Sequence, residues 1–270
     1  MRLTVSTWNI NSVRLRIELV AKFVKAVRPD VLCLQETKCP DDRFPLKRLR
    51  RLGYEHAALN GQRGHHGVAV VSRLPFDHVG IEGFGGKSDS RHLAVVIGER
   101  AGLRDPLTVH NLYVPAGGDA PDADANPKFA HKLKFLDDMR GSPQLRPDRR
   151  RSILLGDLNV APLEHDVWSH RQLINVVSHT PIECEKLNAV QRAGQWIDIM
   201  RTLVPEPTKL YTWWSYRSPD WAAANKGRRL DHIWVAPALA DRVASMAVCK
   251  HTRGWPRPSD HVPVSATIEV

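Results

Sequence analysis

The stretch Ser152-Ile-Leu-Leu-Gly-Asp-Leu-Asn159 joins an apolar run to a short polar signature. The run from Ser152 to Leu155 predicts a buried strand, because continuous apolar residues are typical of strands covered on both faces. Asp157 and Asn159 flank Leu158, so their side chains point the same way in an extended chain. The stretch therefore aims a base and an amide at one target beyond the end of a strand.

Four further signatures have the same plan, with polar residues placed beside an apolar, strand-like run. They are Trp8-Asn9-Ile10-Asn11, Gln35-Glu36-Thr37-Lys38, Leu230-Asp231-His232 and Ser259-Asp260-His261. Several strand ends share one edge of a fold, so we expect these carboxylates, amides and the imidazole to gather there. Such an edge suits a hard cation and a phosphate.

The spacing of apolar residues predicts many strands with only a few helices between them. Strands are predicted at Val31 to Gln35, Gly67 to Val71, Leu93 to Ile97, Leu107 to Val114 and Val262 to Val270, and helices at Leu15 to Val27, from Phe44-Pro45 to before Gly53, from Asn126-Pro127 onward and near Leu187 to Leu203. Because some adjacent strands lack a helix between them, we expect two mixed sheets packed face to face with helices outside. A single domain over residues 1–270 is the expected organisation.

Composition narrows the function classes. The 270 residues are 42% hydrophobic and carry a formal net charge of +10, which favours a polyanionic partner. Basic clusters lie at Arg43 to Arg51, Arg146 to Arg151 and Lys226 to Arg229. The four cysteines form no CxxC pair, so neither a zinc site nor a disulfide framework is indicated. With no signal-peptide pattern or membrane-length apolar run, we expect a cytoplasmic, monomeric protein that does not bind membranes.

Glu36 emerges where a buried strand meets solvent. A carboxylate there without neighbouring Cys or His suits Mg²⁺ or Mn²⁺ better than zinc, although a helix cap or an ion pair is an equal alternative. At Asp260-His261, an Asp beside a His can raise the pKa of the imidazole, and the imidazolium can stabilise charge on a phosphate. Asp231 is a second carboxylate that could orient His261. Tyr113 offers a phenol to a phosphate, or simply packs.

The order and content of these motifs resemble the exonuclease III family of DNA-repair nucleases, within the endonuclease/exonuclease/phosphatase (DNase I-like) superfamily. The resemblance runs from Thr7-Trp8-Asn9-Ile10-Asn11 to Ser259-Asp260-His261-Val262-Pro263-Val264, through Leu34-Gln35-Glu36-Thr37-Lys38, Gly67-Val68-Ala69, Tyr113-Val114-Pro115, Gly156-Asp157-Leu158-Asn159-Val160-Ala161-Pro162, Tyr211-Thr212-Trp213-Trp214-Ser215-Tyr216-Arg217 and Arg229-Leu230-Asp231. It implies a four-layer α/β sandwich and Mg²⁺-dependent cleavage of DNA phosphodiesters. The implied substrate is double-stranded DNA with abasic sites or with blocked or recessed 3′ ends.

The resemblance also implies a role for each matching residue. Glu36, with Asn9 and Asp260 nearby, would hold the metal. Asp157 would orient or deprotonate the attacking water. Asn159 and Tyr113 would contact the scissile phosphate, and His261, held by Asp260 or Asp231, would bind its non-bridging oxygen.

An abasic sugar needs a small apolar pocket, to which Trp213, Trp214 and Leu230 correspond, with Trp255 as a further aromatic neighbour. Three positions depart from the family pattern: Ala116 replaces Asn or Gln, Arg228 replaces Trp or Leu, and Ser215 replaces an acidic residue or Thr. Arg228 near a 3′ end would favour a terminal phosphate over a flipped abasic sugar. Two alternatives remain: a superfamily phosphatase or phosphodiesterase acting on non-DNA phosphoesters, and a catalytically silent nucleic-acid-binding domain.

Overall fold

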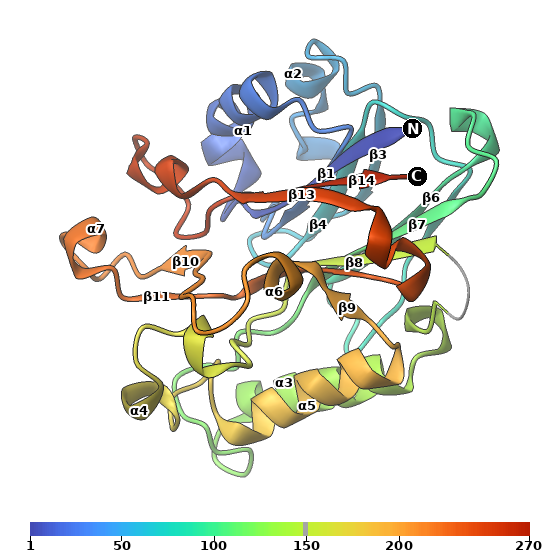
Figure 1. The fold of residues 1–270 in the computed structure, drawn as a ribbon. Coiled ribbons are helices and arrows are strands. Elements are labelled where there is room, and N and C mark those ends of the chain that lie inside the picture. The colour runs from blue at the N-terminus through green and yellow to red at the C-terminus, as the bar shows by residue number, and fades with distance from the viewer. Residues whose placement is uncertain (148–150) are drawn as a thin grey trace.

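The computed structural model describes residues 1–147 and 151–270, and within them two six-stranded sheets lie face to face (Figure 1). The first sheet has the order β13 (Val243–Val248), β14 (Val264–Glu269), β1 (Arg2–Asn9), β2 (Val31–Gln35), β4 (Val68–Ser72) and β3 (His56–Asn60). The second has the order β5 (His78–Gly80), β6 (His92–Ile97), β7 (Leu107–Tyr113), β8 (Arg151–Asp157), β12 (Asp231–Val235) and β9 (Ile197–Asp198). A short ribbon pairs β10 (Trp213–Trp214) with β11 (Gly227–Arg228).

Helices cover the outer faces of both sheets, which confirms the predicted four-layer sandwich. Figure 1 shows α1 (Val13–Val27) and α2 (Leu46–Arg50) on one side, and α3 (Pro127–Gly141) and α5 (Pro181–Ala193) on the other. Residues of β2 alternate between layers: Val31 and Cys33 join the core between the sheets, while Leu32 and Leu34 pack with α1 and α2. The continuous apolar run is therefore explained by burial on both faces.

Sheet register brings the polar signatures to one edge. Strands β1 and β2 run parallel, so Asn9 and the Glu36 position just beyond β2 lie at the same end. In the second sheet Asp157 pairs with Tyr113 of parallel β7 and with Asp231 of antiparallel β12. Since the two sheets stack, these five strand ends face one region.

The helix predicted near Leu187 to Leu203 is wrong in both its start and its continuity. Helix α5 begins at Pro181, because the Thr180 hydroxyl accepts from the Glu183 backbone N–H and the Glu183 carboxylate caps Thr180 in return. It ends before Gly194, and the chain then forms β9 and a separate helix α6 (Ile199–Leu203). The sequence reading also missed β3, β5, β13 and the short helices α4 (His170–Leu173) and α7 (Trp221–Ala224).

Two further expectations concern the surface of the molecule. Arg149 and Arg150 of the basic cluster at Arg146 to Arg151 lie outside the described residues. In residues 1–147 and 151–270, no helix has the length and apolar character needed to cross a membrane.

Candidate active site

Four residues at the common edge adopt left-handed backbone conformations that non-glycine residues rarely occupy. The φ angles are 47° for Asn11, 50° for Glu36, 51° for Lys38 and 52° for Asn159. Such conformations cost free energy and are concentrated at functional sites, where the surroundings hold them in place. The strained backbone therefore indicates a functional site just beyond the ends of β1, β2 and β8.

A buried histidine joins two carboxylates from the second sheet. His261 Nδ1 lies 2.8 Å from Asp231 Oδ2, and His261 Nε2 lies 3.7 Å from Asp157 Oδ2. His261 is 5% exposed and both aspartates are fully buried. The choice between Asp231 and Asp260 as the partner of His261 is thereby resolved in favour of Asp231.

The charges in this group shift one another's pKa. Burial raises the pKa of Asp157 to about 7, partly opposed by the neighbouring His261. Burial alone would lower the pKa of His261, but the carboxylates of Asp231 and Asp157 raise it to about 10. The group thus offers an imidazolium beside a carboxyl that can exchange a proton near neutral pH.

Hydrogen bonds orient the Asp157 carboxylate. Its Oδ1 accepts from the Asn159 backbone N–H at 3.0 Å, and its Oδ2 accepts from Asn159 Nδ2 at 3.1 Å and Asn9 Nδ2 at 2.8 Å. Asn159 Nδ2 also donates to the Val114 carbonyl at 2.9 Å. Asp157 and Asn159 therefore lie together, but through the left-handed backbone of Asn159 and not through the extended chain that the spacing argument assumes.

Glu36 is the centre of a second polar group on the first sheet. Its Oε1 accepts from Asn9 Nδ2 at 2.9 Å and from the Tyr113 hydroxyl at 2.8 Å, and its Oε2 lies 2.7 Å from Lys38 Nζ. Burial disfavours the charge on Glu36, yet Lys38 and these hydrogen bonds hold its pKa below the usual value. Burial, reinforced by Glu36 and Asp157, raises the pKa of Tyr113 well above its ordinary value, so its phenol stays protonated.

Asp260 is linked to Glu36 through a chain of side chains. Asp260 Oδ1 accepts from Asn11 Nδ2 at 3.2 Å, and Asn11 Oδ1 accepts from Lys38 Nζ at 2.7 Å. Asp260 Oδ2 accepts from Trp213 Nε1 at 2.9 Å. The carboxylates of Glu36 and Asp260 and the Asn11 amide therefore lie around one position. The Lys38 ammonium supplies positive charge there, bonded to Glu36 and Asn11.

These oxygens fit a hard divalent cation, since carboxylates and amide oxygens are its preferred ligands. Asn9 presents its amide nitrogen to Glu36 and Asp157, so in this arrangement it orients the carboxylates. In the part of the chain that the structure describes, Asp157, Asp231 and His261 also lie close enough together to hold a metal ion. Of these three, Asp231 and His261 are joined by a hydrogen bond, while Asp157 lies 3.7 Å from His261 Nε2.

A cleft of about 830 Å³ opens over both groups. Its lining includes Glu36, Asn159, Trp213, Leu230, Asp260 and His261, together with the cations Arg217, Lys226 and Arg228. The guanidinium of Arg228 stacks on the Trp213 ring with 5.4 Å to its centroid. It also donates to the Val177 carbonyl at 3.0 Å and to Ser178 Oγ at 2.7 Å.

The model of the endonuclease/exonuclease/phosphatase family matches residues 6–261 of the chain. The chain belongs to this family. Exodeoxyribonuclease III of Haemophilus influenzae is 30% identical over 266 residues, covering 96% of this chain and 97% of the relative. An AP endonuclease from Archaeoglobus fulgidus, 31% identical, has a similar structure with a TM-score of 0.89, covering 99% of this chain and 100% of that one. The 3′ phosphatase NExo from Neisseria, solved with a product DNA hairpin, is 29% identical with a TM-score of 0.89 and the same coverage.

These similarities confirm the expected relation to exonuclease III. The fold prediction is confirmed as well, because relatives in the endonuclease/exonuclease/phosphatase family superpose over nearly the whole chain. The match spans all five signatures, including the strand ends that carry Asp157 and Glu36.

Two tryptophans expected at an abasic-sugar pocket lie elsewhere in this family member. Trp214 is 2% exposed, and it packs edge-on against Trp221 with 5.5 Å between ring centroids. It follows Trp213 on the short strand β10, so its side chain takes the opposite face. Trp255 packs against Trp8 with 6.5 Å between ring centroids, on the α1 side of the first sheet. Trp213, Leu230 and Arg228 line the cleft as expected.

The cleft also contains residues that the sequence reading missed. Trp168, Val176, Val177 and Ser178 line its wall. All three departures from the family pattern, Ala116, Ser215 and Arg228, line the cleft as well. Residues 168–178 carry no motif or periodic pattern that could have assigned them. Asn11 and Lys38 could have been found, since both stand inside the quoted signatures.

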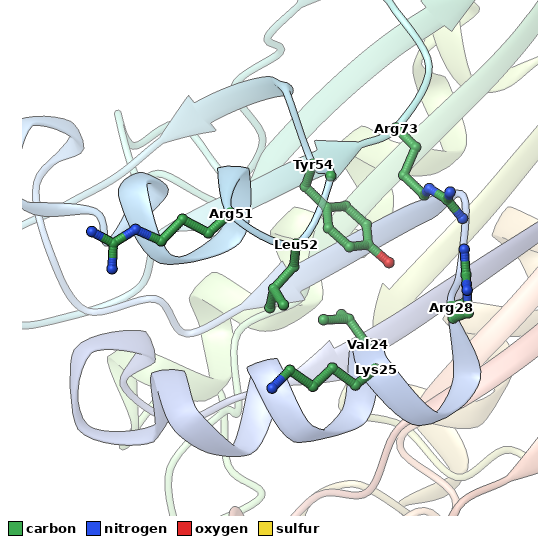
Figure 2. A pocket seen from close by; sticks show the side chains of 8 residues that line it. Val24, Lys25, Arg28, Arg51, Leu52, Tyr54 and Arg73 are labelled. Atoms are coloured by element: carbon green, nitrogen blue, oxygen red, sulfur yellow. The ribbon is translucent and has the colours of Figure 1, made fainter.

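A separate basic hollow of about 380 Å³ lies at the other end of the first sheet (Figure 2). Its lining includes Arg28, which precedes β2, and Arg73, which follows β4, and Figure 2 shows both beside the Tyr54 hydroxyl. Glu36 lies beyond the opposite end of β2. This hollow is therefore distinct from the cleft over Asp157.

Proposed function

We propose that the chain is a metal-dependent DNA-repair phosphodiesterase of the exonuclease III type. The observation that carries the proposal is the meeting of Asp157, His261 and Glu36 at one edge of the sandwich, beneath a single cleft. A nucleic-acid-binding scaffold needs no such combination. A protonatable carboxyl, an imidazolium and a buried carboxylate with oxygen neighbours are the groups that phosphodiester hydrolysis uses.

The chemistry divides among the residues of the chain. Asp157, held by Asn9 and Asn159, takes a proton from the attacking water. The water oxygen adds to phosphorus while the P–O3′ bond breaks, and the released 3′ oxygen takes a proton from solvent to become the 3′-hydroxyl. His261, kept protonated by Asp231, donates a hydrogen bond to a non-bridging oxygen. Tyr113 donates its one hydroxyl proton to Glu36 in this structure and would turn from Glu36 to donate to the phosphate.

Glu36 and Asp260 are the proposed metal ligands, with Asn9 beside them, and Mg²⁺ is the proposed ion, with Mn²⁺ as a substitute. When bound, the ion would neutralise phosphate charge and stabilise the leaving 3′ oxygen. Glu36 is suited to this because its pKa is held low, so that it is ionised at neutral pH.

Double-stranded DNA is the proposed partner, and the relatives that are named for acting on DNA support it. The net charge of +10 and the cations Arg217, Lys226 and Arg228 in the cleft fit a phosphate backbone. The proposed lesions are abasic sites, cut on their 5′ side, and blocked or recessed 3′ ends. We propose that the protein acts as a monomer.

Two end-labelled duplexes test the proposal, one with an internal abasic site and one with a recessed 3′ end. Each is incubated with the protein in Mg²⁺ and, separately, in EDTA. We expect Mg²⁺-dependent cleavage of at least one duplex, with a 3′-hydroxyl on the product. Cleavage confined to the 3′ terminus would refute abasic incision, and no cleavage of either duplex would refute the whole proposal.

A further inference from the structure

A fully buried ion pair joins helices α3 and α5 behind the cleft. Lys132 Nζ lies 2.5 Å from Glu183 Oε1, and both side chains have no exposed surface. Removing two charges from water is unfavourable, and stability alone is weak grounds for such a pair. The other hydrogen bonds of Lys132 and Glu183 indicate a further role for the pair.

The Lys132 ammonium binds two loops of the cleft. It donates to the Asn159 carbonyl at 2.7 Å and to the Ala116 carbonyl at 3.2 Å. Asn159 has a φ angle of 52°, a strained conformation that requires support from its surroundings. That conformation lets the backbone N–H and the amide of Asn159 both reach Asp157.

The Glu183 carboxylate binds a third wall of the cleft. It accepts from the Ser178 backbone N–H at 2.9 Å and from the Thr180 hydroxyl at 2.6 Å. Ser178 Oγ in turn accepts from the Arg228 guanidinium at 2.7 Å. The ion pair is thus linked by hydrogen bonds to Asp157 through Asn159, and to Arg228 through Ser178.

We propose that Lys132 and Glu183 are positioning residues that fix the loops of Ala116, Asn159 and Ser178 around the substrate. The inference rests on the proposed function, because it assigns the pair to the geometry of that same site. Its consequence is that loss of the pair lowers turnover even where the fold is retained. An ion pair that served only the packing of α3 on α5 would not have this effect.

The test replaces both charges with apolar side chains of similar length, Lys132→Met with Glu183→Leu. Removing both partners leaves no unpaired buried charge. It also removes the Glu183 cap at the start of α5, so the fold of the variant is measured before its activity. The matched control is Lys186→Met with Asp137→Leu, since Lys186 Nζ and Asp137 form an ion pair at 2.7 Å between the same two helices at the protein surface. Thermal unfolding and near-UV circular dichroism report the fold of each variant.

We expect kcat on the cleaved duplex to fall about tenfold or more in the Lys132/Glu183 variant, with a smaller change in KM. The Lys186/Asp137 variant should keep the kcat of the unmodified protein. An unchanged kcat in the folded Lys132/Glu183 variant would overturn the proposal. If that variant does not fold, Lys132→Met with Glu183→Gln is assayed instead, because the amide oxygen can still accept from the Ser178 N–H and no buried charge is left unpaired; it should lower kcat without altering the circular dichroism spectrum.

A second measurement separates this proposal from the proposed function. The side-chain amide signal of Asn159 in a nitrogen–proton correlation spectrum should shift in the Lys132/Glu183 variant and stay in place in the control. If the unmodified protein cleaves neither duplex, the proposed function is wrong. The Asn159 signal would still report whether the Lys132–Glu183 pair holds this residue in place. An unmoved signal would contradict the positioning role whatever the activity.

Discussion

Asp231 holds His261 in the site, with Asp231 Oδ2 lying 2.8 Å from His261 Nδ1. Both side chains are buried, and Asp157 lies on the other side of the imidazole ring, 3.7 Å from Nε2. Two carboxylates thereby favour the imidazolium against the effect of burial. The charge available to a bound phosphate depends on this relationship.

Replacing Asp231→Asn should lower both the pKa of His261 and the activity. The neutral amide no longer favours the imidazolium, so that form is lost at a lower pH than in the unmodified protein. We expect kcat at neutral pH to fall about 100-fold, within the range for loss of acid–base assistance. Nuclear magnetic resonance titration of His261 gives the pKa, and Asp260→Asn, which removes a carboxylate bonded to Trp213 and Asn11, should shift it much less. Equal shifts in the two variants would contradict the assignment of Asp231.

Replacing Glu36→Gln should weaken metal dependence specifically. The variant keeps the hydrogen-bonding shape of the side chain and loses its charge, so a divalent cation should bind about 10-fold or more weakly. Titration of activity with Mg²⁺ measures this as a higher half-saturating concentration. An unchanged Mg²⁺ curve would show that the ion is held elsewhere, for example by Asp157 and Asp231.

Replacing Arg228→Ala should change the balance between the two DNA substrates. The guanidinium lies over Trp213 in the cleft, where it can bind a terminal phosphate and obstruct a flipped sugar. We expect the ratio of abasic incision to 3′-end processing to rise. The comparison variant is Lys226→Ala, because Lys226 also lines the cleft and lies over the Trp168 ring. A ratio that does not move in Arg228→Ala would refute this role.

Stability should fall in acid because of a buried histidine pair. His92 Nε2 lies 3.2 Å from His110 Nδ1, and burial lowers the pKa of His110 to about 4. The unfolded chain binds a proton below about pH 6.5 while the folded chain does not, so stability is fully present above that pH and is lost as pH falls toward 4. Each such group adds up to about 1.4 kcal/mol per pH unit to the slope of the free energy of unfolding against pH.

The slope reports how many protons the chain takes up on unfolding. His110→Asn should therefore reduce that number by about one between roughly pH 6 and pH 5. Urea unfolding at several pH values measures the slope, which a simple packing defect would leave unchanged. The exposed His78→Asn is the matched control. A slope unaltered by His110→Asn would show that this histidine does not contribute to acid sensitivity.

Much of the fold follows from local sequence patterns. The strand ends at Asn9, Glu36 and Asp157 are predictable because a buried strand needs a continuous apolar run, and a polar residue marks where it ends. The predicted helix from Leu187 begins too late, because apolar spacing does not register a cap; the capping residues Thr180 and Glu183 do mark the start of α5 in the sequence.

The site was predictable in its residues and less so in its contacts. Asp231 and Asp260 stand equally well beside a histidine in sequence. The pairing of β12 with β8 sets Asp231 opposite Asp157, and only the folded structure shows that His261 meets this pair. Trp213 and Trp214 are adjacent, so a single-residue difference in register decides which one lines the cleft. Lys132 carries no motif, because its partners Ala116, Asn159 and Glu183 are distant along the chain.

The most direct test of the central claim is single-turnover cleavage of the labelled duplexes by the Asp157→Asn variant in Mg²⁺. The amide cannot accept the proton of the attacking water, so the rate should fall about 100-fold or more while the duplex still binds. Cleavage by Asp157→Asn at the rate of the unmodified protein would contradict the account.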